Sequence, residues 1–129
     1  MIKSTINLLG LVIALLVPIA HVSAEEEIYT LERLQHESWF VSEPKSVEEV
    51  EADSLNEMRK AKENRSDLPL VPFGVQNEAW LGFKKLLNDG EMLYFISAPE
   101  KDWKRLRGTS GYAIFRDGRV AYYFRTMVN

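Results

Sequence analysis

The chain has 129 residues, no cysteine and a formal net charge of −3. The absence of cysteine excludes disulfides, thiolate nucleophiles and thiolate metal sites. The length allows one modest domain, and the negative net charge argues against a nucleic-acid-binding protein.

The first 24 residues have the order of a secretory signal peptide. Lys3 forms a positive n-region, an apolar run covers residues 8–20, and small residues precede Glu25. The apolar run is too short for a membrane span. We therefore expect cleavage after Ala24 and export of the remaining 105 residues to the periplasm or the exterior, without a transmembrane anchor.

Charge is segregated along the rest of the chain. Residues 25–57 hold 11 acidic and two basic side chains, whereas residues 58–129 hold 8 acidic and 13 basic ones. This division predicts an acidic segment over residues 25–67 and a small, more basic domain over residues 68–129. The same charges could also form ordinary solvated surfaces, or the acidic segment could fold back on the domain.

The acidic segment contains one well-marked helix, over residues 46–63. Ser46 and Glu49 have the spacing of a capping box, in which each side chain accepts a hydrogen bond from the other residue's backbone. The apolar stripe of this helix is thin, which predicts loose docking or partial formation. Residues 25–41 fit either a helix or a short strand. We therefore expect the segment to be helical or partly disordered.

Residues 68–129 predict a small α+β domain. An amphipathic helix is expected over residues 77–88, with Asn77 as its N-cap. A strand follows over residues 91–98, and a single helical turn follows Pro99. Asp117-Gly118 lies between two alternating runs and predicts a C-terminal β-hairpin. The expected fold is a three-stranded antiparallel sheet with this one helix on one face.

The C-terminal third carries a pattern of aromatic and glycine residues. It runs Trp103-x-x-Leu106-x-Gly108-x-x-Gly111-Tyr112-Ala113-x-x-Arg116-Asp117-Gly118-x-Val120. This pattern resembles the tails of small uncharacterised exported bacterial proteins. The resemblance implies a bacterial, periplasmic setting and no particular activity, cofactor or catalytic residue.

Catalytic features are sparse in the expected mature chain. His36 is its only histidine and is expected to be an ordinary surface residue. The Gly108-Thr109-Ser110-Gly111 sequence lacks the spacing of a nucleophile elbow and predicts a turn, or alternatively an anion-binding nest of backbone N–H groups. No catalytic, cofactor-binding or metal-binding residue is assigned, so we expect a protein that is not an enzyme.

The best candidate binding surface is a set of basic residues with one aromatic residue. Arginine beside aromatic rings suits carboxylate or phosphate groups, although such a surface could equally serve solubility. The set comprises Lys101, Trp103, Lys104, Arg105, Arg107, Arg116, Arg119 and Arg125.

The favoured function is that of a non-enzymatic binding or accessory protein that contacts an envelope protein or an anionic envelope component. One alternative is a small hydrolase with a carboxylate pair drawn from Glu91, Glu100 and Asp102, which would require a shared pocket and a desolvated carboxyl group. Another is a structural protein that associates through its last strand, which would lie at a sheet edge.

Overall fold

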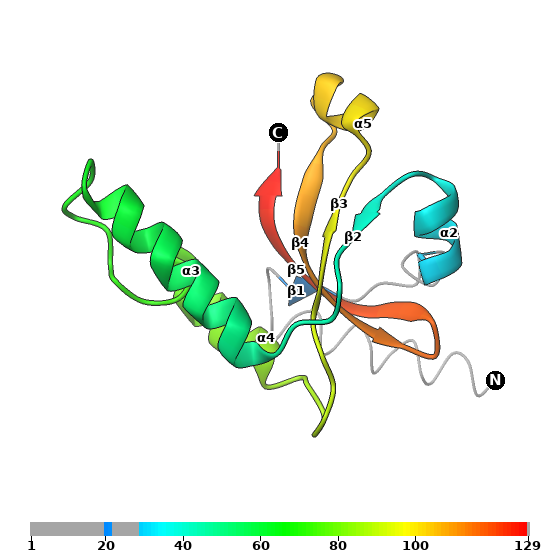
Figure 1. Cartoon of the computed structure of the whole chain (residues 1–129), viewed down its shortest axis with the longest axis horizontal. Coiled ribbons are helices and arrows are strands. Elements are labelled where there is room, and N and C mark those ends of the chain that lie inside the picture. Colours follow the sequence, from blue (N-terminus) through cyan, green and yellow to red (C-terminus); the bar gives the residue numbers. More distant parts are fainter. Residues whose placement is uncertain (1–19, 22–28, 129) are drawn as a thin grey trace.

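The computed structural model describes residues 20–21 and 29–128. It is an α+β structure in which one antiparallel sheet lies between helices (Figure 1). The sheet has five strands in the order β1-β5-β4-β3-β2, so the prediction of three strands was wrong. Apart from β1 (Ala20–His21), the expected signal peptide and its cleavage site lie outside the described residues.

The predicted hairpin forms the centre of the sheet. β4 (Thr109–Arg116) and β5 (Arg119–Val128) are antiparallel and are joined at Asp117 and Gly118. These two residues have φ angles of 53° and 73°, as a two-residue type I′ turn requires. β3 (Tyr94–Ser97) pairs with the other side of β4, which confirms the expected strand.

The two additional strands come from before residue 68. β2 (Phe40–Val41) pairs with β3, and β1 pairs with Tyr123 and Phe124 of β5. Both strands are only two residues long, so they lack the alternating pattern by which a strand is recognised in a sequence. The segment that the sequence left ambiguous contains both a helix, α2 (Leu31–His36), and strand β2.

Helices cover both faces of the sheet, not one face as expected (Figure 1). α3 (Val47–Lys62) and α4 (Asn77–Lys84) lie on one side, and α2 lies on the other. The capping box of α3 is confirmed, because the Glu49 N–H donates to Ser46 Oγ at 3.1 Å and the Ser46 N–H donates to Glu49 Oε1 at 3.0 Å. α4 ends four residues earlier than predicted.

Each face of the sheet carries its own hydrophobic cluster. Val50 of α3 joins Trp80, Phe83 and Phe124 on one face, and all four are fully buried. On the other face, the members are Leu34, Ile96, Ala113, Val120 and Tyr123. Because Leu34 and Val50 both come from the acidic segment, its described part completes the core on both faces.

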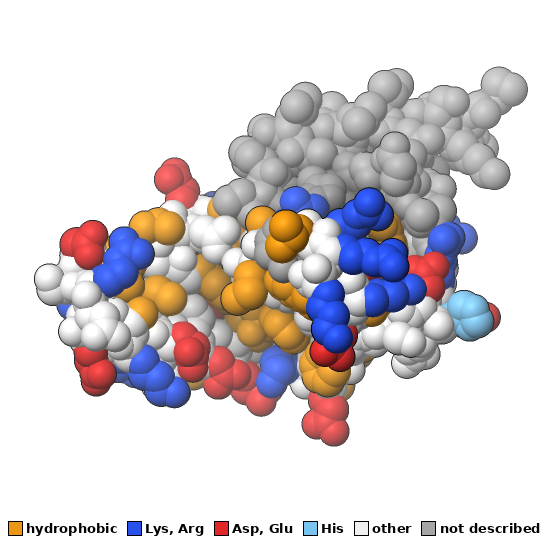
Figure 2. Space-filling view, turned by 90° about the horizontal axis from the view of Figure 1, so that it is seen from above, with side chains coloured by type: hydrophobic (Ala, Val, Ile, Leu, Met, Phe, Trp, Pro, Cys, Tyr) orange, Lys and Arg blue, Asp and Glu red, His pale blue; other side chains and the backbone are white. Residues whose placement is uncertain are grey.

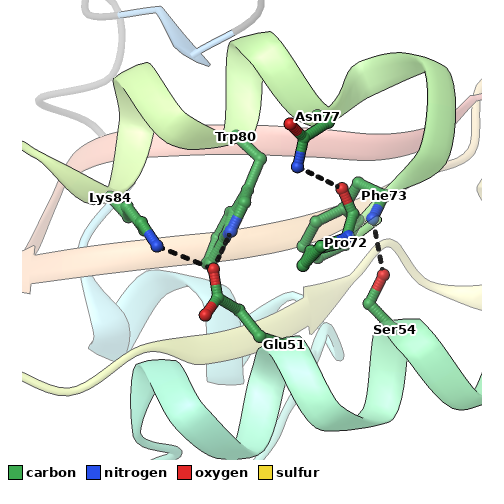
Figure 3. Close-up of polar contacts among 7 residues, drawn as sticks. All are labelled: Glu51, Ser54, Pro72, Phe73, Asn77, Trp80 and Lys84. Atoms are coloured by element: carbon green, nitrogen blue, oxygen red, sulfur yellow. Dashed lines mark hydrogen bonds and ion pairs between the residues drawn. The ribbon is translucent and has the colours of Figure 1, made fainter. Parts of the chain in front are cut away.

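A carboxylate ties α3 to α4. Glu51 Oε2 accepts hydrogen bonds from Trp80 Nε1 at 2.7 Å and from Lys84 Nζ at 2.8 Å (Figure 3). Burial opposes ionisation of Glu51, but these two hydrogen bonds outweigh it and hold its pKa below the ordinary value. No local pattern in the sequence indicates this contact, because Glu51 and Trp80 are 29 residues apart.

Asn77 does not cap α4 as predicted. The N-cap position is Gln76, without a side-chain hydrogen bond, and Asn77 Nδ2 instead donates to the carbonyl oxygen of Pro72 at 2.9 Å (Figure 3). A short 3₁₀ helix, η2 (Gly74–Gln76), leads directly into α4. It follows Phe73, whose φ is 62° and whose N–H donates to Ser54 Oγ at 2.7 Å. The connector over residues 68–73, which contains Pro69 and Pro72, is thereby fixed against α3.

Candidate cationic surface at the α5 end

The predicted helical turn after Pro99 is present as α5 (Glu100–Lys104) and lies at one end of the sheet (Figure 1). Trp103 fixes this turn to the sheet. Its Nε1 donates to the carbonyl oxygen of Ala98 at 3.1 Å, and its ring covers Gly108, where an added Cβ would lie 2.1 Å from a ring carbon. Trp103 is therefore a half-buried anchor and not an open stacking platform.

Four basic side chains surround this anchor and are all exposed: Lys101, Lys104, Arg105 and Arg107. Lys104 Nζ lies 3.4 Å from Glu100 Oε1, and both side chains are largely solvated. This ion pair therefore contributes little to the stability of the turn. Among the described residues, no carboxylate lies within ion-pair distance of the other three cations. Figure 2 views the molecule from this end and shows Lys and Arg side chains gathered there.

Exposed apolar side chains lie at the same end of the molecule. Leu106, between two of the arginines, is 73% exposed. At the end of β5, Met127 and Val128 are 60% and 58% exposed, and Val128 pairs with Thr109, two residues after Arg107. We call these three residues and the four cations of α5 and its following turn the α5-end surface.

Arg116 does not belong to this surface, although the sequence grouped it there. It lies at the far end of β4, seven residues from Thr109, which corresponds to about 23 Å along a strand. Its guanidinium donates to Glu91 Oε2 at 2.9 Å, to Glu91 Oε1 at 2.8 Å and to the Leu86 carbonyl oxygen at 2.6 Å. These contacts join the α4–β3 connection to the hairpin, which is a structural role.

The ion pair between Glu91 and Arg116 shifts the pKa values of both groups. Hydrogen bonds from Arg116 lower the pKa of Glu91 to about 2, and burial opposes this shift only in part. The hydrogen bonds to Glu91 in turn raise the pKa of Arg116. Glu91 is therefore ionised near neutral pH, which is the opposite of what a general acid needs.

The two remaining predicted arginines occupy different places. Arg119 lies directly after the hairpin turn, where it bridges to Thr30, and so it is also remote from α5. Arg125 is exposed and pairs with Gly111, within three residues of the β5 end that carries Val128. The predicted set is thus divided between two ends of the sheet. Of the three hairpin arginines, only Arg125 lies close to the α5-end surface.

Glu91 lies apart from Glu100 and Asp102, the other two carboxylates considered for hydrolysis. Glu91 precedes β3 and is held by Arg116, whereas Glu100 and Asp102 follow β3 in α5. His36 is exposed in the last turn of α2. Within the described ranges, no group of three or more His, Cys, Asp or Glu side chains is placed to hold a metal ion.

The segment from Gly108 to Gly111 is not the expected turn. β4 begins at Thr109, and neither glycine has a positive φ. Gly111 is required for close approach, because an added Cβ would lie 2.1 Å from the carbonyl oxygen of Phe124, next to a register shift between β4 and β5. The backbone here pairs within the sheet, which removes the basis for an anion-binding nest.

No helix in the described part of the chain has the length and apolar character needed to cross a membrane. Comparison with known protein families, with curated proteins and with solved structures finds no match to the chain.

Proposed function

We propose that this is a small exported binding or accessory protein that acts without catalysis. It attaches through the α5-end surface to an anionic partner in the cell envelope. The observation that supports this proposal is the concentration of four exposed cations on one anchored turn, three of them without a carboxylate partner among the described residues.

Such an arrangement suits attraction at a distance followed by contact. Unpaired surface cations raise the local concentration of an anionic partner and accelerate association, and salt screens this effect. Paired cations such as Arg116 contribute less, because their field is cancelled by the adjacent carboxylate. The exposed apolar side chains beside the cations then supply short-range contact area.

The experiment is retention of the mature protein on isolated envelope membranes in buffers of increasing salt. One variant removes three cations from the α5-end surface: Lys101→Gln, Arg105→Gln and Arg107→Gln. A control removes three exposed cations elsewhere that have no carboxylate partner among the described residues: Arg59→Gln, Lys85→Gln and Arg119→Gln. We expect retention that falls with salt, is lost in the first variant and persists in the control. Equal retention of both variants would contradict the proposal.

A second candidate is association through the edge of the sheet. Cleavage after Ala24 would remove β1, which pairs with Tyr123 and Phe124 of β5, and within the described residues no other strand pairs with the outer edge of residues 123–128. An open edge with apolar ends can add a strand from another chain. Size-exclusion chromatography with light scattering tests this candidate. A dimer that dissociates when Met127→Lys places a charge at the edge would favour it. A monomer over a wide concentration range would exclude self-association.

A further inference from the structure

The chain leaves α5 through a turn that places a leucine where glycine is usual. The Leu106 N–H donates to the Trp103 carbonyl oxygen at 3.2 Å, and the Arg107 N–H donates to the Asp102 carbonyl oxygen at 2.8 Å. This pair of hydrogen bonds is the Schellman motif of a helix C-terminus. Its left-handed position, with a φ of 59°, is occupied by Leu106.

Folding does not account for a leucine at this position. A side chain with a Cβ is strained in the left-handed region, where glycine is not. Burial could offset this strain, but the Leu106 side chain is 73% exposed. The protein thus holds an apolar side chain in solvent, in a conformation that costs free energy, on a turn that Trp103 fixes to the sheet.

The surroundings of Leu106 indicate what would cover it. Arg105 and Arg107 flank it in sequence, and both are exposed. Met127 and Val128 add exposed apolar groups from the adjoining end of β5. A flat interface that presents negative charge outside and hydrocarbon beneath would match both kinds of side chain together.

We propose that the partner of the α5-end surface is an anionic lipid surface, into which Leu106 inserts while the flanking cations contact the headgroups. This inference rests on the proposed function and specifies its partner. A protein partner with acidic side chains would satisfy the cations, but it would need a matching apolar pocket for Leu106. A bilayer offers that environment at every point of its surface.

The first test is sedimentation of the protein with vesicles of phosphatidylcholine alone or with phosphatidylglycerol added. We expect binding only to the anionic vesicles. Leu106→Gly should raise resistance to denaturant, because it relieves the left-handed strain, yet weaken vesicle binding by about five- to tenfold through loss of apolar insertion. A loss of binding alongside a gain in stability separates a contact role from a folding role.

The second test uses the absence of cysteine, which allows a single site to carry a dye. Leu106→Cys is labelled with a polarity-sensitive fluorophore, and Val75→Cys, at an 81% exposed position in η2, is the control. Anionic vesicles should shift the emission of the dye at position 106 to shorter wavelength and leave the dye at position 75 unchanged.

The outcomes distinguish this inference from the proposed function. If vesicles bind through the cations but Leu106→Gly binds as well as the parent and the dye at position 106 does not shift, insertion is wrong and electrostatic attachment remains. If anionic vesicles bind nothing while envelope membranes retain the protein through the same three cations, the partner is not lipid. If neither binding depends on the cations, the proposed function fails as well.

Discussion

The indole ring of Trp103 lies directly on Gly108, so closely that the backbone at position 108 has no room for a side chain. This contact sets the angle at which α5 leaves the sheet, since Trp103 belongs to α5 and Gly108 immediately precedes β4. The cations of the α5-end surface are consequently presented on a fixed support. Preorganisation of this kind lowers the entropic cost of binding.

Gly108→Ala should therefore destabilise the fold by about 2 kcal/mol, a typical cost of overpacking. Its added methyl would lie 2.1 Å from a carbon of the Trp103 ring. Chemical denaturation of the two proteins measures the difference. In a double-mutant cycle with Trp103→Leu the penalty should shrink, because the ring that causes the clash is gone. A penalty that is unchanged in the Trp103→Leu background would show that some other contact restricts position 108.

The ion pair of Glu91 and Arg116 should make stability depend on pH. The pKa of Glu91 in the folded state is lowered from 4.5 to about 2, so the ionised form of Glu91 stabilises the folded state. That contribution is fully present above pH 4.5 and is lost as the pH falls towards 2. Unfolding free energies measured across this range should show the parent protein losing its advantage over Glu91→Gln. Parallel curves for the two proteins would contradict the assigned pKa.

The contact of Glu51 with Trp80 and Lys84 gives a graded prediction. Glu51→Ala removes the acceptor of both hydrogen bonds and should destabilise the protein by about 1–2 kcal/mol, because it leaves the buried indole N–H without its partner. Lys84→Met should cost less, since Glu51 still accepts from Trp80 and the lysine is partly solvated. Thermal unfolding of both variants ranks them, and the reverse order would show that the ion pair dominates.

The sequence was most informative where local chemistry decides the structure. Asp117 and Gly118 both adopt positive φ, and so the hairpin could be predicted from two residues. Ser46 and Glu49 are three residues apart and likewise report on each other directly. In both cases the signal and its structural consequence lie within one turn of the chain.

The sequence was least informative where distant segments meet. Arg116 was grouped with the α5 cations, because nothing local shows that Glu91, 25 residues earlier, occupies its guanidinium. β2 consists of two residues whose strand character comes from pairing with β3. Val50 and Leu34 place the acidic segment in the core, but each packs against residues that are distant in the sequence, so no local pattern shows this.

Leu106 was also missed as a site residue. Its neighbours drew attention through their charge, whereas its own signal is conformational: an exposed apolar residue at the position after a helix end where glycine is expected. The sequence predicted a single helical turn after Pro99 but not the residue at which it ends, so the left-handed position could not be assigned to Leu106.

The most direct test of the central claim is the salt dependence of binding to anionic vesicles, compared between the two triple variants. Removal of Lys101, Arg105 and Arg107 should abolish most of the binding at low salt and flatten its dependence on salt. Removal of Arg59, Lys85 and Arg119 changes the net charge by the same amount and should leave both nearly unchanged. Equal losses in the two variants would show that net charge alone governs attachment and would contradict a specific surface at the α5 end.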